Sequence, residues 1–102
     1  MLKINFEFRK GIFFIRLIGT LNNQNYKQKA QALKELIIDN KFKYIVINTN
    51  YLESIDLDGI NYLIEIFNIA KNNKGNLVLC DKKSILKKIL KVNIPSIKDE
   101  IE

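Results

Sequence analysis

The chain has 102 residues, of which 47% are hydrophobic, which is enough apolar material for the core of one domain and too little for two. It contains one cysteine, Cys80, and no histidine, which excludes an intrachain disulfide, histidine-dependent catalytic triads and histidine-bound zinc or iron. The formal net charge is +6, but 15 of the 17 basic residues are lysines, and with 18 isoleucines and 13 asparagines they indicate an AT-rich coding sequence rather than a surface selected for phosphate.

The N-terminal part of the chain predicts a β-hairpin. Apolar and polar residues alternate over residues 2–9, as in a strand with one face in water. Lys10-Gly11 supplies a turn, and residues 12–18 form a nearly continuous apolar strand. Gly19 and the polar residues 20–24 are expected to end this second strand.

A helix and a buried strand are predicted next. Apolar residues between Tyr26 and Ile37 recur at helical spacing with most lysines outside the stripe, and Asn40 supplies a stop. Residues 44–47 form a short β-branched run, typical of a strand buried on both faces. Residues 48–55 are expected to form a loop.

The C-terminal half predicts two more helices around a further strand. Residues 58–73 have apolar stripes on several sides, so this helix is expected to be covered by its neighbours, with Gly75 as its C-cap. Residues 77–80 follow as a buried strand in which the cysteine is a small core residue. Ser84 is a predicted N-cap of a third helix, and residues 96–102 are expected to form a short charged tail.

These elements predict a single α/β domain over residues 1–102. Their order is β-β-α-β-α-β-α, and strands that alternate with helices after a hairpin favour a mainly parallel sheet with packed helices. The longest apolar run, residues 12–15, is far shorter than the ~20 residues that a spanning helix needs. With one cysteine and no targeting segment, the protein is expected to be cytoplasmic and not inserted in a membrane.

The most distinctive segment joins the predicted strand at residues 44–47 to the next helix. Asp56 and Asp58 come where the free N–H groups of a helix start are exposed, and a carboxylate there caps the helix and is favoured by its dipole. A calcium loop is excluded, because Gly59 comes three residues after Asp56 and the pattern needs glycine at its sixth position. The Asp-Leu-Asp-Gly run resembles the first motif of haloacid-dehalogenase phosphatases, but Ile60 follows where that motif has threonine.

Three segments, in one order and spacing, resemble the STAS domain of anti-sigma factor antagonists and sulfate transporters. Residues 16–22 resemble its strand-Gly-x-Leu-Asp segment, with Asn22 in place of the aspartate. Residues 45–60 resemble its strand-Asn, Leu and Asp-Ser-Ser-Gly-Leu segment, and residues 75–80 resemble its Gly-x-Leu-x-Leu-x strand. The resemblance covers nearly the whole chain and implies the STAS fold.

The resemblance implies a non-enzymatic, bacterial protein-binding module with no cofactor, no metal and no catalytic residue. In the family, a partner anti-sigma factor with a kinase-like fold phosphorylates a serine after the aspartate, which switches the antagonist off. Leu57 occupies that acceptor position here and cannot accept phosphate, while Asp58 is interpreted as a helix cap or as a constant negative charge. The residues expected to bind the anti-sigma factor are Asn22, Ser54, Asp56, Leu57, Asp58, Gly59 and Ile60.

Several alternatives stay open. Ser54 or Thr49 could replace the lost phosphorylation site, and a homodimer is a further candidate assembly. A STAS subunit of a membrane transport complex or sensory assembly is the alternative binding function, and a small Asp-dependent phosphatase is the alternative of another class. Nucleic acid is not an expected partner, because the lysines of residues 82–91 are not interleaved with arginines or aromatics. Whether the family's last strand and helix are present is also open, because the chain after Pro95 is short.

Overall fold

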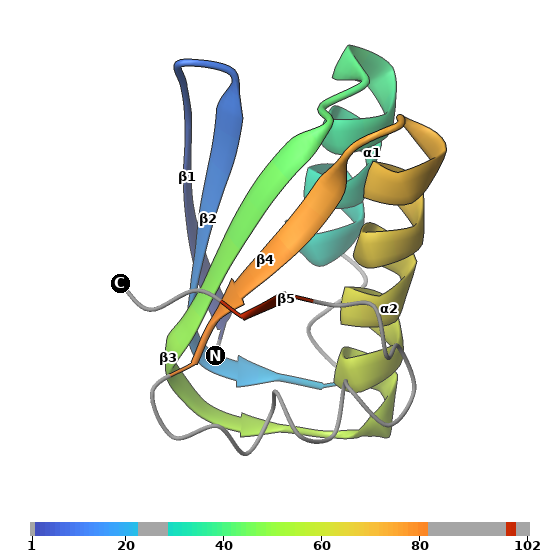
Figure 1. The fold of residues 1–102 in the computed structure, drawn as a ribbon. Helices are drawn as coiled ribbons and strands as arrows, with labels where there is room; N and C mark the ends of the chain where they lie inside the picture. The colour runs from blue at the N-terminus through green and yellow to red at the C-terminus, as the bar shows by residue number, and fades with distance from the viewer. Residues whose placement is uncertain (1, 23–28, 82–97, 100–102) are drawn as a thin grey trace.

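The computed structural model describes residues 2–22, 29–81 and 98–99. The elements in chain order are β1 (Leu2–Arg9), β2 (Ile12–Leu21), α1 (Gln31–Asn40), β3 (Tyr44–Ile55), α2 (Leu57–Asn72), β4 (Asn76–Cys80) and β5 (Lys98–Asp99) (Figure 1). This order confirms the predicted α/β fold. The third helix predicted from Ser84 lies outside the described residues.

The strands form one mixed sheet in the spatial order β1-β2-β3-β4-β5. β1 and β2 are antiparallel, and the other neighbours are parallel. The predicted hairpin is confirmed: Lys10 and Gly11, with φ of 53° and 81°, form a two-residue turn of the kind that matches the twist of two antiparallel strands. The segment expected to be only a charged tail contributes β5, which pairs with β4.

Strands β2 and β3 are longer than the sequence predicts. β2 continues through Gly19 to Leu21, and β3 continues to Ile55, so the loop expected at residues 48–55 is wrong. The two extensions pair with each other, Leu21 opposite Ile55, after two register shifts at which β3 has the extra residues. The backbone of each extension therefore pairs with the backbone of the other. The pattern of apolar residues within one segment cannot reveal this pairing.

Helices α1 and α2 lie side by side on one face of the sheet (Figure 1). They are joined by an ion pair of 2.6 Å between Lys34 Nζ and Glu65 Oε2, and by a hydrogen bond from the Tyr62 hydroxyl to the carbonyl of Ala30. Tyr62 and Ile66 are buried, which confirms the prediction that α2 is covered along its second apolar stripe.

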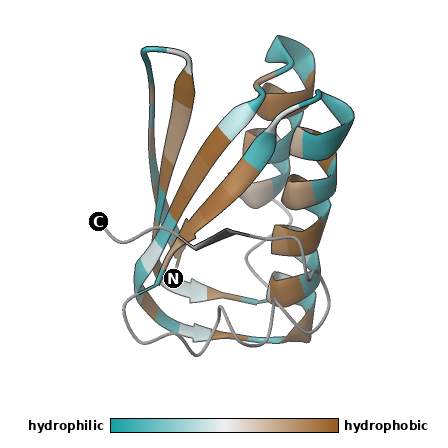
Figure 2. Ribbon diagram, in the orientation of Figure 1, coloured by the Kyte–Doolittle hydropathy of each residue, from teal (hydrophilic) through white to brown (hydrophobic). Residues whose placement is uncertain are grey.

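The core lies between the two helices and the inner face of the sheet. Figure 2 shows hydrophobic residues along the central strands and in stripes on the helices. Alternate residues of each strand point inward, and the buried ones in β2, β3 and β4 are Phe13, Ile15, Leu17, Leu21, Ile45, Ile47, Leu77 and Leu79. Cys80 is buried as predicted.

Gly75 has a different role from the predicted C-cap. The residue with positive φ after α2 is Lys74, at 65°. A Cβ at Gly75 would lie 1.8 Å from the carbonyl oxygen of Lys43, so glycine is required by the close approach of two backbone segments. This contact precedes the pairing of Tyr44 with Asn76, where β3 and β4 begin. None of the helices in the described ranges is long and apolar enough to cross a membrane.

Candidate functional site

Asp56 alone connects β3 to α2, and it caps the helix. Its backbone is extended, with φ −99° and ψ −177°, and its Oδ1 accepts a hydrogen bond of 2.8 Å from the N–H of Gly59. The helix begins at Leu57, one residue earlier than predicted. The expectation that at least one of the two aspartates caps the helix is confirmed for Asp56. The interpretation of Asp58 as a cap is wrong, because Asp58 is an exposed residue of the first helical turn.

The start of α2 is fixed on the end of β2. The N–H of Asp56 donates to the carbonyl of Leu21 at 3.2 Å. Gly59 is buried, and a Cβ there would lie 2.6 Å from the same carbonyl oxygen, so a larger residue would push the helix away. Because Leu21 pairs with Ile55, the residues that follow these strands, Asn22 and Asp56, lie at one edge of the sheet.

The predicted site residues divide into a surface group and a supporting group. Leu57 is 70% exposed. Asp58, the next residue, and Ser54, three residues earlier, are also exposed. Gly59 is buried and Ile60 is packed against the core, so these two residues position the helix rather than present a surface. No sequence pattern pointed to the carbonyl of Leu21, because a backbone contact carries no side-chain signal.

The two alternative hydroxyl groups differ in accessibility. Thr49 is 4% exposed, and its Oγ1 donates to the carbonyl of Cys80 at 3.2 Å. Ser54 is exposed, and its Oγ donates to Oγ1 of Thr20 at 3.2 Å. Only the Ser54 hydroxyl is placed where another protein could reach it.

The site is acidic although the chain is basic. Glu53, Asp56 and Asp58 lie within six positions of one another, and the sequence has no lysine or arginine between Lys43 and Lys71. A helix N-terminus tolerates this charge, because the free N–H groups of the first turn carry partial positive charge. The net charge of +6 describes the whole chain and gives no indication that the start of α2 is acidic.

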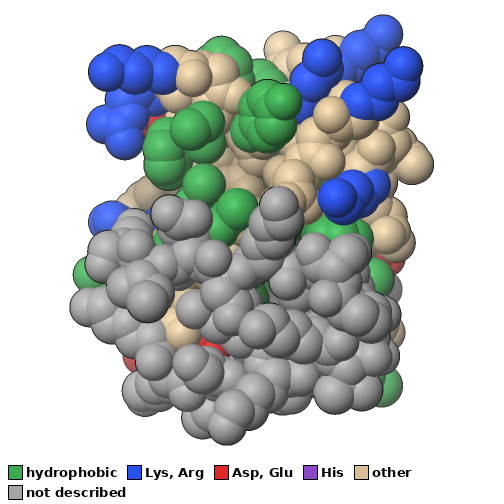
Figure 3. Space-filling model, in the orientation of Figure 1, with side chains coloured by type: hydrophobic (Ala, Val, Ile, Leu, Met, Phe, Trp, Pro, Cys, Tyr) green, Lys and Arg blue, Asp and Glu red, His purple; other side chains and the backbone are tan. Residues whose placement is uncertain are grey.

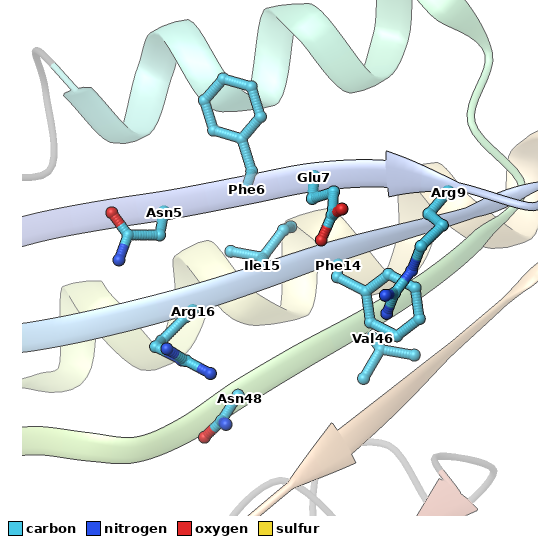
Figure 4. A pocket seen from close by; sticks show the side chains of 9 residues that line it. All are labelled: Asn5, Phe6, Glu7, Arg9, Phe14, Ile15, Arg16, Val46 and Asn48. Carbon is cyan, nitrogen blue, oxygen red and sulfur yellow. The ribbon is translucent and has the colours of Figure 1, made fainter.

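The hollow seen in Figure 4 lies elsewhere, on the face of the sheet opposite α1 and α2. It has a volume of about 310 Å³, and its lining includes Phe14 and Val46 together with Arg9 and Arg16. The Arg9 guanidinium lies 4.9 Å from the centre of the Phe14 ring. Figure 3 shows hydrophobic side chains gathered on the face toward the viewer, between groups of Lys and Arg side chains. None of the predicted site residues lines this hollow.

Comparison with known proteins identifies the fold family. The family model described as the STAS domain matches residues 3–96. The chain belongs to the STAS domain family. This confirms the resemblance found in the segments at residues 16–22, 45–60 and 75–80.

Relatives of this STAS domain include named anti-sigma factor antagonists. The anti-sigma F factor antagonist of Paenibacillus polymyxa is 22% identical over 80 residues, which are 78% of this chain and 68% of that protein. The anti-sigma factor antagonist SpoIIAA in its unphosphorylated form has a TM-score of 0.80 at 15% identity, covering 100% of this chain and 89% of that one. The phosphorylated form of the Bacillus cell fate determinant SpoIIAA has a TM-score of 0.77 at 19% identity, with coverages of 98% and 93%. At these identities the solved structures show a shared fold.

Proposed function

We propose that this STAS domain is a non-enzymatic binding module of the bacterial cytoplasm, an antagonist that binds an anti-sigma factor with a kinase-like fold. The names of the Paenibacillus relative and of the SpoIIAA structures support this role. The proposed contact surface is the exposed start of α2, Leu57 and Asp58, with Ser54 and Asn22 at its margin.

The exposure of Leu57 carries the proposal. Leu57 is 70% exposed on the first turn of a helix, so a partner that covers it removes apolar surface from water, which favours binding. The backbone that carries this side chain is held in place, because Asp56 caps the helix and the carbonyl of Leu21 accepts from the N–H of Asp56. A backbone that is ordered before binding loses less conformational entropy on binding.

The same residue removes the family's phosphorylation switch. Leu57 stands where the resemblance places a serine, and it has no hydroxyl group. Asp58 next to it carries a permanent negative charge, whereas a phosphate would add a charge of about −2 only on modification. We infer that binding by this domain is not controlled by phosphorylation at residue 57.

A binding measurement tests the contact surface. Purified kinase-like anti-sigma factors of the same organism are titrated against the wild type and Leu57→Lys by calorimetry. We expect the substitution to raise the dissociation constant by roughly tenfold or more, because a charged side chain replaces a buried contact. Ile38→Lys is the matched control, since Ile38 is an exposed apolar residue of α1, away from the site. Equal effects of the two substitutions would contradict the proposed surface.

A phosphorylation assay tests the loss of the switch. The anti-sigma factor that binds is incubated with ATP and with the wild type, Leu57→Ser or Ser54→Ala. We expect no phosphate on the wild type and a gain of phosphate on Leu57→Ser. Phosphate on the wild type that disappears in Ser54→Ala would show that Ser54 has taken over the switch, and the proposal would then be wrong.

The phosphatase alternative has less support from the site. It requires Asp56 as a nucleophile, but one of the Asp56 carboxylate oxygens is already the acceptor that caps α2. The alternative predicts metal-dependent phosphatase turnover that Asp56→Asn abolishes. If no kinase-like anti-sigma factor binds the wild type, the transport or sensory assembly becomes the better hypothesis.

A further inference from the structure

Strand β1 forms an edge of the sheet and exposes two large aromatic residues. Within the described ranges it pairs with β2 alone. β1 is eight residues long, and Phe6 and Phe8 are 56% and 54% exposed. A long edge strand with apolar side chains is a template for pairing with another strand.

The hairpin geometry decides which backbone groups of β1 are available. A two-residue turn closes on the pair Arg9 and Ile12, and the residues that flank such a turn exchange both of their hydrogen bonds. Hydrogen bonding then alternates along the strand, so the odd-numbered residues of β1 bond to β2. The even-numbered residues direct their N–H and C=O groups outward. In agreement, the carbonyl of Leu2 accepts a hydrogen bond of 3.3 Å from Nζ of Lys29 rather than facing only β2.

We propose that this edge pairs with β1 of a second copy of the chain, antiparallel, around a two-fold axis at Asn5. Ile4 then lies opposite Phe6 of the second copy, twice by symmetry, and each pair exchanges backbone hydrogen bonds. Leu2 would lie opposite Phe8, but Leu2 is 2% exposed and its carbonyl already accepts a hydrogen bond from Lys29, so the contact does not depend on that pair. Lys3 lies opposite Glu7 on the outer face of the sheet, twice by symmetry. The contact joins two sheets into one and is closed, as most homodimer contacts are.

Charge favours this register over the registers that are shifted toward the hairpin turn. A shift that centres the axis on Phe6 places Lys3 opposite Arg9, and a further shift places Glu7 opposite itself. Like charges directly opposite each other destabilise a strand pair. Centring the axis on Phe8 pairs Glu7 with Arg9 but runs into the hairpin turn, so few residues pair. The Asn5 register places opposite charges across from each other and pairs the outward-facing residues Ile4 and Phe6 of each strand.

The exposed charges of β1 also have a competing interpretation. Charged residues on an edge strand commonly prevent pairing with other chains. Lys3 and Glu7 are exposed and have opposite signs, so in the Asn5 register they attract rather than repel. The contact uses no residue at the start of α2, so it is independent of the proposed function.

Charge exchange tests the contact and its register. Sedimentation of the wild type from micromolar to millimolar concentration is expected to show a reversible dimer. Lys3→Glu and Glu7→Lys each place like charges opposite each other twice, and each is expected to raise the dimer dissociation constant roughly tenfold or more. The double variant, and an equimolar mixture of the two single variants, are expected to restore dimerisation. Asp39→Lys, at an exposed position of α1, is the control for charge alone and is expected to dimerise normally.

Amide exchange gives a second readout that does not depend on charge. In the dimer the outward N–H groups of Ile4 and Phe6 become protected as concentration rises, while those of Asn5 and Glu7 are protected throughout. A chain that stays monomeric at millimolar concentration would overturn the proposal. So would a dimer in which Lys3→Glu has no effect, or one in which the amides of Ile4 and Phe6 stay unprotected.

Discussion

Tyr62 shows how one buried polar group connects the two helices. Its side chain is buried, and its hydroxyl donates to the carbonyl of Ala30 at the start of α1. We expect Tyr62→Phe to lower the free energy of unfolding by about 1 kcal/mol, because the phenyl ring keeps the packing but the hydrogen bond is lost. Urea unfolding near neutral pH measures this difference. An unchanged free energy of unfolding would show that the bond contributes nothing to stability.

The same hydroxyl makes stability depend on alkaline pH. Burial, and secondarily the charge of Glu65, raises the pKa of Tyr62 well above its usual value. In the unfolded chain a tyrosine ionises from about pH 10, whereas Tyr62 in the folded protein stays neutral, so rising pH stabilises the unfolded state. We expect the stability difference between wild type and Tyr62→Phe to shrink between pH 8 and pH 11 and then to reverse. A difference that stays constant across this range would contradict the assignment.

At the level of single elements, the spacing of apolar residues predicted the type of each helix and strand. It did not predict how far neighbouring strands would extend one another. The alternation of residues 2–9 and the helical stripe of residues 58–73 are local properties, and both elements formed. The extension of β3 depends on both neighbouring strands. Its end pairs with the end of β2, and the polar residues Asn48 and Thr49 are buried, with the Thr49 hydroxyl donating to the carbonyl of Cys80 in β4. The local sequence around Thr49 does not indicate that a carbonyl 31 residues away will accept its hydrogen bond.

The candidate site shows the same division. Its residue types and the presence of a carboxylate cap were predictable from the sequence. The sequence left open which of Asp56 and Asp58 caps the helix. The helix begins at Leu57, so Asp56 is the cap and Asp58 is an exposed charge of the first turn, and this division of roles came from the structure.

Gly75 fixes where β3 and β4 begin to pair. A Cβ at this position would overlap the carbonyl oxygen and the carbonyl carbon of Lys43, which are backbone atoms that cannot rotate away. We expect Gly75→Ala to lower the free energy of unfolding by about 2 kcal/mol or more, through displacement of the start of β4. Gly11→Ala is the comparison, because it has open space around it and positive φ, and it is expected to cost only about 1 kcal/mol. Equal losses would show that the close approach in the structure is readily relieved.

For the molecule as a whole, the two faces of the sheet differ in how deeply their side chains are buried. Two adjacent phenylalanines of β2, one on each face, allow the difference to be measured. Phe13 is buried under the helices and stacks on Phe42, with ring centroids 4.5 Å apart. Phe14 points to the open face, where it is half-buried beneath Arg9. We expect Phe13→Ala to cost about 3–5 kcal/mol, a large share of the about 5–15 kcal/mol that stabilises a typical domain, and Phe14→Ala to cost less than half as much.

Chemical unfolding of the two variants measures the decrease in the free energy of unfolding for each. The two substitutions change the same residue type in the same strand. The comparison therefore isolates burial from strand propensity, since both substitutions exchange phenylalanine for alanine at central positions of β2. Equal losses would mean that the open face is covered in solution as completely as the helical face. In that case the hollow beside Phe14, Arg9 and Arg16 would be filled rather than accessible. A clear excess for Phe13 would leave this face accessible, with the single core on the helical side.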